Sequence, residues 1–329
     1  MTNTIKWGII GCGDVTEVKS GPGFSKAENS ELVAVMRRNA SKAEDYAKRH
    51  QVKKWYTEAS ELINDPEVNA IYIATPPLNH EEYTLEALKA GKPVYVEKPM
   101  TMNTGSAIRM AEAEKASDTL LTVAHYRRGL PLFIKIKELL DTGAIGQVRF
   151  VNLKMFQPHQ SDLITKTDDN WRVNPEVSGG GLFHDLAPHQ IDLMLYFFGK
   201  AVHYQGFAVN QGGYYKADDL VTGEILFENK IIFNGTWCFT VSPEEKTDLV
   251  EIVGSEGKIS FAVFNQFYTL SRGGKEERFE IQPPQHIQQP MIQMVVNYFL
   301  GQGENPCPAS EGIEVMKIMD SFCKEPEKL

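Results

Sequence analysis

Short apolar strand segments alternate with helical segments over residues 5–123, and this constrains the fold more than any other feature. The strand-like segments span residues 5–10, 32–36, 70–74, 94–96 and 120–123. Helical patterning separates them at residues 41–49, from about Asn79 to Gly91, and at residues 105–116. Asn79 and Glu82 have the spacing of a capping box, which would start the second of these helices. The alternation predicts a mostly parallel sheet with helices on both faces.

The first predicted strand ends in a glycine turn, Gly11-Cys12-Gly13, followed by Asp14 and Val15. Gly11 allows a tight turn, and Gly13 lets the backbone approach a pyrophosphate. The first N–H groups of the next helix would face that phosphate. The third position of the fingerprint is Thr16, which weakens the argument for close helix–strand packing. The context predicts a Rossmann dinucleotide-binding domain, and a plain tight turn is the alternative.

The residues after the second strand bear on the choice of cofactor. NAD sites usually place a carboxylate there, where it binds the ribose hydroxyls. This chain has Arg37, Arg38 and Asn39, with Ser41 just beyond and no carboxylate in the turn. Guanidinium groups pair with a 2′-phosphate and stack on adenine, so we favour NADP(H) over NAD(H). The alternative is that both arginines form a solvated approach to the helix.

Residues that follow two later strands complete the predicted cofactor site. Thr75 and Pro76 follow residues 70–74, and His80 lies near the start of the next helix. Glu97 and Lys98 follow residues 94–96. Open parallel sheets bind ligands at the carboxyl ends of their strands. We therefore assign these residues to the cofactor site, with Glu97 supporting the lysine or the cofactor and Lys98 also reaching the substrate.

The pattern changes after residue 123. One helix, at about residues 131–140, leads into strand-like segments at residues 148–155, 202–209, 223–227, 231–239, 249–253, 258–263 and 266–270. Short turns between several of them predict an antiparallel sheet. Helices are expected near residues 186–198, 291–300 and 310–323. We divide the chain into a Rossmann domain (1–123) and a substrate-binding and oligomerisation domain (124–329). The C-terminal helix is free to pack back near the first domain.

Motifs in both halves of the chain together resemble one family of oxidoreductases. They are Gly11-x-Gly13, Ala74-Thr75-Pro76-Pro77, Glu97-Lys98-Pro99, Trp171-Arg172, Gly179-Gly180-Gly181, and Asp185 with His189. This set is similar to the Gfo/Idh/MocA family, which includes glucose–fructose oxidoreductase, inositol dehydrogenase, 1,5-anhydrofructose reductase and dihydrodiol dehydrogenase. The resemblance implies a Rossmann domain plus an α/β domain with a large open, mostly antiparallel sheet. It also implies hydride transfer with a carbohydrate-like substrate, and it places Lys98, Asp185 and His189 at the catalytic positions.

These residue types suit alcohol oxidation or carbonyl reduction. A neutral imidazole accepts an alcohol proton, and a nearby ammonium stabilises charge on the oxygen. Asp185 and His189 are four residues apart and hence on one helical face. Proline is tolerated in the first helical turn, so Pro188 predicts a helix start near His184 or Asp185. The helix dipole would then favour a neutral His189. Asp185 as a helix cap, and His184 as the base, remain alternatives.

Further polar residues are assigned to the substrate site with Lys98, Asp185 and His189. Tyr126 and Arg127 follow the last strand of the first domain, where interdomain charge pairing is an equal alternative. Trp171 and Arg172 would line the substrate pocket, because the aromatic face of Trp171 can pack on the C–H face of a sugar. Their alternative role is to anchor a loop.

Bulk properties exclude several other classes of protein. The net charge is −9, whereas a nucleic-acid surface needs basic stripes. The four cysteines lie far apart without metal-ligand spacing, so we expect reduced thiols, no metal site and a cytoplasmic location. No apolar run is long enough for a transmembrane helix. The family resemblance implies a homodimer or homotetramer formed through the C-terminal sheet.

The leading hypothesis is an enzyme that transfers a hydride between NADP(H) and a sugar, inositol or related polyol or keto compound, in which Lys98 and His189 handle the proton. A non-catalytic NAD(P)-sensing regulator of the same fold is the first alternative. A dehydrogenase of a non-sugar diol or carbonyl is the second.

Overall fold

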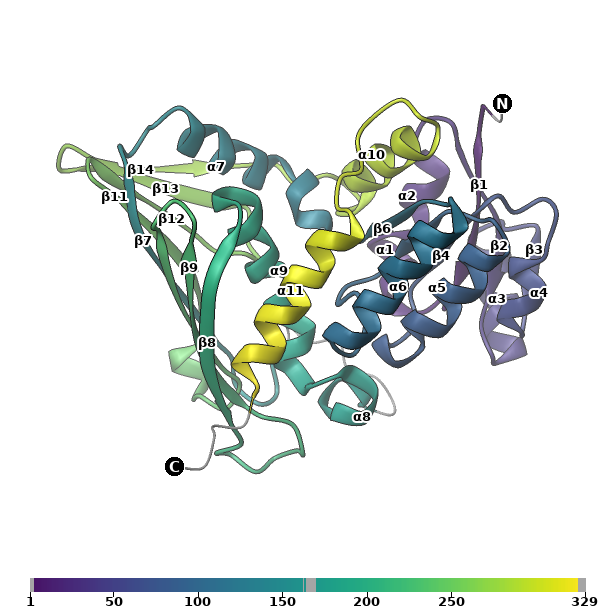
Figure 1. Ribbon diagram of the computed structural model, residues 1–329, viewed down its shortest axis with the longest axis horizontal. Helices are drawn as coiled ribbons and strands as arrows, with labels where there is room; N and C mark the ends of the chain where they lie inside the picture. The colour runs from purple at the N-terminus through teal and green to yellow at the C-terminus, as the bar shows by residue number, and fades with distance from the viewer. Residues whose placement is uncertain (1–2, 162, 164–169, 325–329) are drawn as a thin grey trace. The chain divides into compact units, whose positions relative to one another are not determined.

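A computed structural model describes residues 3–161, 163 and 170–324 as two compact units (Figure 1). The first unit comprises the chain up to Gly129 together with Pro284–Met316. The second comprises Leu130–Pro283 and the chain from Lys317 onward. The division thus falls six residues beyond the expected boundary at 123–124. A later stretch of chain also belongs with the first unit, and helix α11 (Ala309–Phe322) contributes residues to both.

The first unit contains a fully parallel six-stranded sheet in the order β3-β2-β1-β4-β5-β6. Its strands are β1 (Ile5–Ile10), β2 (Ser30–Met36), β3 (Lys54–Tyr56), β4 (Ala70–Ile73), β5 (Val94–Val96) and β6 (Leu121–Val123). This order is that of the doubly wound nucleotide-binding fold, so the predicted Rossmann sheet is confirmed. The sequence analysis missed β3, which has three residues and little apolar patterning.

Helices connect these strands and cover the sheet. They are α1 (Asp14–Val18), α2 (Gly21–Lys26), α3 (Ala40–Arg49), α4 (Ala59–Ile63), α5 (His80–Lys89), α6 (Thr104–Ser117), α10 (Gln289–Phe299) and part of α11. The predicted capping box at Asn79 is wrong. A 3₁₀ turn (Pro77–Asn79) precedes α5 and already holds Asn79 at φ −99° and ψ −1°, with no capping bond from its side chain in the described chain. An N-cap side chain normally needs an extended backbone.

The second unit is built on an eight-stranded sheet in the order β14-β13-β12-β11-β7-β10-β9-β8. Its strands are β7 (Val148–Phe156), β8 (Ala201–Val209), β9 (Leu220–Phe227), β10 (Ile232–Cys238), β11 (Thr247–Gly254), β12 (Gly257–Phe261), β13 (Phe267–Arg272) and β14 (Lys275–Glu280). Among the described strands of this sheet, β7 and β10 pair in parallel and every other pair is antiparallel, which confirms the large, mostly antiparallel sheet. The sequence analysis missed β14, because Lys275–Glu280 is highly charged and lacks apolar alternation.

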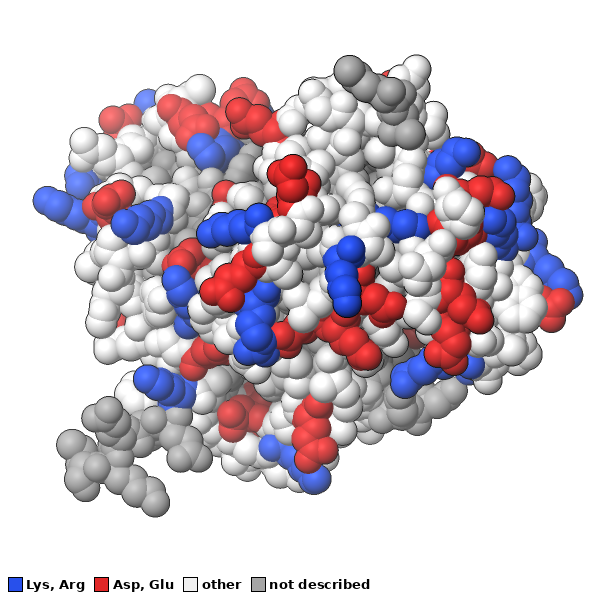
Figure 2. Space-filling view, turned by 45° about the vertical axis from the view of Figure 1, so that its right-hand side comes forward, with Lys and Arg blue, Asp and Glu red and all other residues white. Residues whose placement is uncertain are grey.

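The described part of the second unit also contains three helices between Leu130 and Pro283. They are α7 (Pro131–Asp141), α8 (Pro175–Ser178) and α9 (Gly181–Phe198). Helix α9 packs on the large sheet, where the rings of Phe183 and Trp237 lie 5.2 Å apart at an interplanar angle of 83°. No helix within the described ranges is long and apolar enough to cross a membrane. Lysines and arginines are interspersed with acidic residues on the face shown in Figure 2.

Candidate cofactor and catalytic site

The glycine turn after β1 has the geometry that the sequence predicts. Gly11 adopts φ +94°, and a Cβ there would lie 2.8 Å from the carbonyl carbon of Ala74 and from the nitrogen of Thr75. Both the conformation and the close approach to the segment that follows β4 therefore require glycine. A Cβ on Gly13 would instead find its nearest described neighbour, Gly11 O, 3.9 Å away. The space above Gly13 is the cradle that an approaching phosphate needs.

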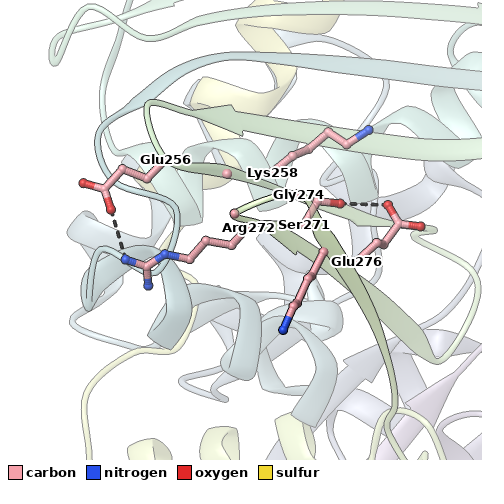
Figure 3. A pocket seen from close by; sticks show the side chains of 9 residues that line it. Glu256, Lys258, Ser271, Arg272, Gly274 and Glu276 are labelled. Atoms are coloured by element: carbon pink, nitrogen blue, oxygen red, sulfur yellow. Dashed lines mark hydrogen bonds and ion pairs between the residues drawn. The ribbon is translucent and has the colours of Figure 1, made fainter.

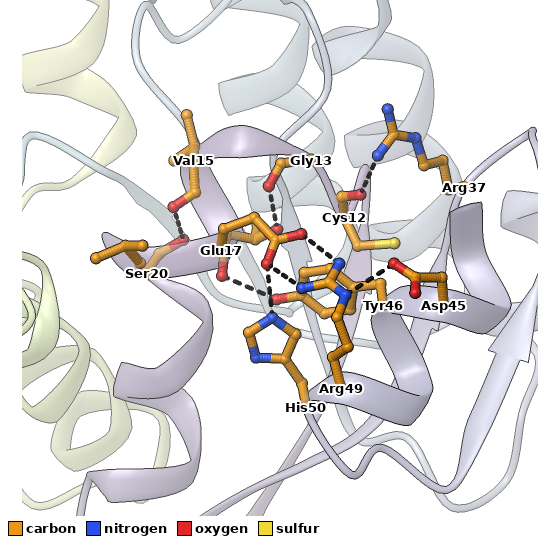
Figure 4. Close-up of polar contacts among 12 residues, drawn as sticks. Cys12, Gly13, Val15, Glu17, Ser20, Arg37, Asp45, Tyr46, Arg49 and His50 are labelled. Carbon is orange, nitrogen blue, oxygen red and sulfur yellow. Dashed lines mark hydrogen bonds and ion pairs between the residues drawn. The ribbon is translucent and has the colours of Figure 1, made fainter.

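Thr16 replaces the third glycine of the fingerprint without strain. Its Oγ1 donates to Gly13 O over 2.7 Å, and its carbonyl accepts a 2.8 Å hydrogen bond from Tyr46 Oη (Figure 4). The close backbone approach has moved to Gly21, where a Cβ would lie 2.1 Å from Thr16 O. Helix α1, which starts at Asp14, has only five residues and so presents a short N-terminus to the cradle. Asp14 is exposed and Val15 is half-buried.

A charged cluster missed by the sequence analysis joins α1 to α3. Arg49 donates from both Nη atoms to Glu17 over 2.7 Å, and its Nε lies 2.7 Å from Asp45 (Figure 4). His50 Nε2 lies 2.8 Å from Glu17. The hydrogen bond from Arg49 lowers the pKa of Glu17 from its ordinary 4.5 to about 2. The cluster holds the helix after the glycine turn against the helix that follows the arginine pair.

The Glu17 cluster should make the unfolding free energy decrease as the pH falls into the acid range. A carboxyl whose pKa falls on folding stabilises the protein above its unfolded pKa, and this contribution disappears as pH falls from about 4.5 through about 2. Glu17→Gln should flatten the decline of the unfolding free energy over that interval, by up to about 1 kcal/mol given the partial exposure. Chemical denaturation at several pH values measures this. Glu44→Gln, from an exposed pair with Lys48, is the control, and equal slopes for Glu17→Gln and wild type would contradict the assignment.

The two arginines after β2 have different surroundings. Arg37 is half-buried and donates from Nη1 to Cys12 O over 3.1 Å, so it braces the glycine turn (Figure 4). Arg38 is exposed. Asn39 caps α3 by accepting from Lys42 N over 3.0 Å, and Ser41 Oγ donates to Asn39 Oδ1 over 2.8 Å. Arg38 and Ser41 therefore stand on the solvent side of the turn.

The ends of β4 and β5 are tied together by His80. Its buried ring lies with Nε2 2.8 Å from Thr75 O and Nδ1 3.0 Å from Pro99 O, and burial lowers its pKa. Pro76 lies next to this contact, half-buried. Thr75 Oγ1 is buried and has no hydrogen-bond partner among the described residues. His80 thus acts within the protein, and Thr75 lies against the glycine turn.

Glu97 is buried and Lys98 is half-buried at the end of β5. The carboxylate of Glu97 accepts from Tyr72 Oη over 2.5 Å and from Gln288 Nε2 over 2.8 Å. It also accepts from the backbone N–H of Lys98 over 3.1 Å. Tyr126 and Arg127 lie in the same unit in a buried 3₁₀ turn (Tyr126–Gly129), with the guanidinium of Arg127 5.5 Å from the Tyr126 ring centroid.

Each residue of the glycine triplet in the second unit has its own reason to be glycine. Gly179 ends α8 at φ +91°, in the left-handed region. A Cβ on Gly180 would lie 2.1 Å from the ring of His184. Gly181 has φ +77°, and a Cβ there would lie 2.4 Å from that of Ala217. The triplet therefore lets the chain turn sharply into α9 directly beneath the His184 ring.

The predicted start of α9 is wrong. The helix begins at Gly181, whose N–H donates to Ser178 Oγ over 2.9 Å, and Pro188 is its eighth residue. The glycine turn determines the start, and the helix tolerates the missing N–H of Pro188 in its interior. His189 is therefore more than two turns from the N-terminus, beyond the reach of the terminal dipole. Asp185 is the fifth helical residue, so its alternative role as the cap is also excluded.

Side chains from α9 and from a 3₁₀ turn that precedes α8 (Trp171–Val173) form a polar group in the second unit. Arg172 is buried, its Nε lies 3.3 Å from Asp185 Oδ2, and its guanidinium lies 4.4 Å from the Trp171 ring centroid. His189 is buried, with its ring edge-on to Phe264 at 5.7 Å. Burial lowers the pKa of His184 to about 4, which keeps that ring neutral near pH 7. Lys98 belongs to the first unit and His189 to the second, so their cooperation stays a prediction.

A pocket between hairpins of the large sheet does not belong to this site. It is lined by residues of β12, β13 and β14 and their turns (Figure 3). Arg272 pairs there with Glu256 at 3.0 Å, and Ser271 Oγ donates to Glu276 over 2.7 Å. None of the predicted site residues lines it.

Comparison with known proteins matches both parts of the chain. Residues 5–125 match the family model "Oxidoreductase family, NAD-binding Rossmann fold", and residues 133–260 match "GFO/IDH/MocA C-terminal domain". An oxidoreductase of Formosa agariphila is 49% identical over 98% of this chain and 99% of its own length. D-xylose 1-dehydrogenase (NADP(+)) of Hypocrea jecorina is 35% identical over 54% of this chain and 49% of its own. A levoglucosan dehydrogenase complexed with NADH and levoglucosan superposes with a TM-score of 0.84 at 20% identity, covering 97% of this chain and 96% of that one.

Proposed function

The chain belongs to the Gfo/Idh/MocA family of NAD(P)-dependent oxidoreductases, and from this we propose that it transfers a hydride between NADP(H) and a sugar, inositol or related polyol or keto compound. The observation that carries the proposal is the pairing of a nucleotide cradle at Gly11 and Gly13 with a second unit that holds Asp185, Arg172 and His189. In this proposal the first unit binds the dinucleotide, and the second binds the substrate.

The residues at the carboxyl edge of the parallel sheet fit a dinucleotide. The open space above Gly13 admits a pyrophosphate, with Asp14 and Val15 at the start of the short helix beside it. The unpartnered Thr75 hydroxyl, together with Pro76, would line the cofactor on the β4 side. Arg37, Arg38 and Ser41 would hold the adenosine end, while His80, Glu97 and Lys98 would shape the nicotinamide end.

The bound nicotinamide supplies the hydride chemistry, and the protein must position the substrate and move one proton. Lys98 would hydrogen-bond the reacting oxygen and stabilise negative charge on it. His189 would take the proton from an alcohol or return it to a carbonyl oxygen. Asp185, held by its ion pair with Arg172, would orient His189 or accept a hydrogen bond from a hydroxyl of the substrate.

A hydroxyl-rich substrate suits the side chains near Asp185. Arg172 and Asp185 offer donors and acceptors to neighbouring hydroxyls, and the Trp171 ring offers an apolar face for C–H groups. Tyr126 and Arg127 would add donors from the first unit. Relatives named as xylose and levoglucosan dehydrogenases act on carbohydrates, which supports this substrate class.

Incubation of the purified protein with NADP⁺ and a panel of aldoses, inositols, anhydro sugars and aromatic diols tests the function directly. We expect the absorbance of reduced nicotinamide to increase when a sugar or polyol is added. Turnover confined to aromatic diols would move the protein to the dihydrodiol class. Saturable NADPH binding without turnover in either direction would favour a sensor and contradict the proposal.

The preference for NADP(H) rests on the side chains after β2. Relatives use either nicotinamide, since one is named for NADP⁺ and another holds NADH. Arg38 is exposed beside Ser41, so Arg38→Asp should raise the KM for NADPH by roughly 10- to 100-fold, the effect of losing a charge-assisted hydrogen bond. The KM for NADH should change little. Steady-state kinetics with both cofactors measure this, and equal shifts would remove the NADP assignment.

Arg37 provides the informative companion variant. Because its guanidinium also braces Cys12 O, Arg37→Asp should weaken the glycine turn as well as the phosphate contact. We expect it to raise the KM for both cofactors, and to affect NADPH more. An effect on NADPH alone would mean that the Arg37–Cys12 contact does not support the turn.

The exposed face of the large sheet supports assembly into a homodimer or homotetramer. Cross-strand pairing aligns Phe150, Ile232 and Leu226 in one row, and Phe207 and Val209 lie on the same face. These five side chains are 37–61% exposed, unusual for large apolar residues on adjacent strands. Phe207→Asp should shift the mass measured by light scattering to that of the monomer. Val18→Asp, a similarly exposed position outside the sheet, is the control, and a monomeric wild type would refute the interface.

A further inference from the structure

Three donors converge on the carboxylate of Glu97. Tyr72 Oη and Gln288 Nε2 both donate to Oε1, over 2.5 and 2.8 Å, and the N–H of Lys98 donates to Oε2 over 3.1 Å. Glu97 is 6% exposed, and its own N–H pairs with Ile73 O on β4 over 2.9 Å. The side chain thus folds back onto the residue that follows it, and the contact restrains the peptide that carries Lys98.

Gln288 reaches this carboxylate from a distant part of the chain. It lies 191 positions after Glu97 in sequence and is 1% exposed. Its backbone N–H donates to Lys19 O, immediately after α1, over 3.2 Å. One glutamine therefore contacts both the end of the helix that starts at the glycine turn and the acid beside Lys98.

The residues just before Gln288 hold it in place. His286 Nδ1 lies 3.0 Å from Val18 O, at the last residue of α1. Lys26 Nζ lies 2.7 Å from His286 Nε2 and 3.0 Å from Gln285 Oε1. An ammonium only donates, so His286 accepts at Nε2 and donates from Nδ1 to Val18. This segment is attached at several points to α1 and α2, so the Gln288 side chain has little freedom to move.

We infer that Gln288 and Tyr72 are positioning residues for Lys98, acting through the Glu97 carboxylate. A carboxylate has several acceptor sites, and two fixed donors on Oε1 leave Oε2 directed at the Lys98 N–H. Loss of either donor frees Glu97 to rotate, and the Lys98 backbone loses its restraint. Displacements of about 1 Å at a reacting group can cost about 100-fold in rate. The inference rests on the proposed role of Lys98, and it adds a residue that no local motif contains.

Gln288→Met tests the inference, because methionine has similar length and volume but cannot donate. We expect kcat to fall roughly tenfold or more, with the dissociation constant for NADPH within about threefold of wild type. Tyr72→Phe should behave alike. The matched control is Gln293→Met on α10, whose glutamine bonds Glu28 N and Asn297 rather than Glu97. Wild-type kcat in Gln288→Met, or a loss explained by its unfolded fraction, would overturn the inference.

Exchanging the side chains of Glu97 and Gln288 distinguishes a positioning effect on Lys98 from a general effect on stability. Gln288→Glu alone brings two carboxylates into contact and should be more damaging than Gln288→Met. Adding Glu97→Gln restores one donor and one acceptor across the pair, and should recover part of kcat. Failure of the double variant to exceed Gln288→Glu would show that the pairing does not direct Lys98.

A readout independent of turnover distinguishes this inference from the proposed function. Reductive ¹³C-methylation gives each lysine an NMR signal, and the Lys98 signal is the one missing from Lys98→Met. We expect Gln288→Met to shift that signal and Gln293→Met to leave it in place. A shift in a protein that turns over no substrate would support the positioning while refuting the enzyme. An unmoved signal in an active enzyme would refute the positioning alone.

Discussion

Lys98→Met is expected to lower kcat by about 10²- to 10³-fold, the usual loss when one preorganised donor to a developing oxyanion is removed. Methionine keeps most of the aliphatic length of lysine but lacks the ammonium. Lys98 is half-buried at the carboxyl end of β5, and its backbone is held by Glu97. The Lys98 backbone N–H that donates to Glu97 is retained in Lys98→Met, so the strand end should keep this contact.

The binding of NADPH should survive this substitution. Fluorescence titration should give a dissociation constant within about threefold of wild type, because the glycine turn and the arginine pair are untouched. The KM for the sugar should change less than kcat if the ammonium acts chiefly in the transition state. Lys53→Met, which removes an exposed lysine paired with Glu31, is the control. A wild-type rate for Lys98→Met would refute the catalytic assignment.

The sheet of the first unit was predictable because its signals are local. Each of the five predicted strands is a short apolar run that ends at a turn residue, and the alternation of strands and helices leaves few possible topologies. Gly11 shows the same locality, since its left-handed φ follows from one tight turn. The segments missed, β3 and β14, are short or charged, and their neighbours in the sheet rather than their own patterning make them strands.

The site was less predictable where its contacts span long stretches of sequence. Arg49 meets Glu17 across 32 positions, and Gln288 meets Glu97 across 191, with no spacing rule to connect them. A local rule also failed at α9. Pro188 taken alone predicts a helix start, but the glycine triplet that ends seven residues earlier already begins the helix. The helix dipole therefore does not explain a neutral His189. His189 nevertheless lies one helical turn after Asp185, as predicted.

Two histidines on α9 compete for the proton, and their surroundings separate them. Burial lowers the pKa of His184 to about 4, and its ring packs on Gly180. His184 is therefore neutral at pH 7, but its ionisation would appear only near pH 4. In the oxidation direction, kcat/KM should rise with pH as the general base loses its proton, and if His189 is that base the rise should require the His189 side chain.

Replacing His189 should therefore change both the rate and the shape of the pH profile. His189→Ala should lower kcat by about 10²- to 10⁴-fold, the usual contribution of a general base, and remove this rise. His184→Asn should keep that rise even if the altered packing on Gly180 lowers the rate. A rise that survives in His189→Ala and disappears in His184→Asn would transfer the role to His184. Because Phe264 touches the His189 ring from the loop after β12, Phe264→Leu should keep the rise, whereas His189→Ala cannot.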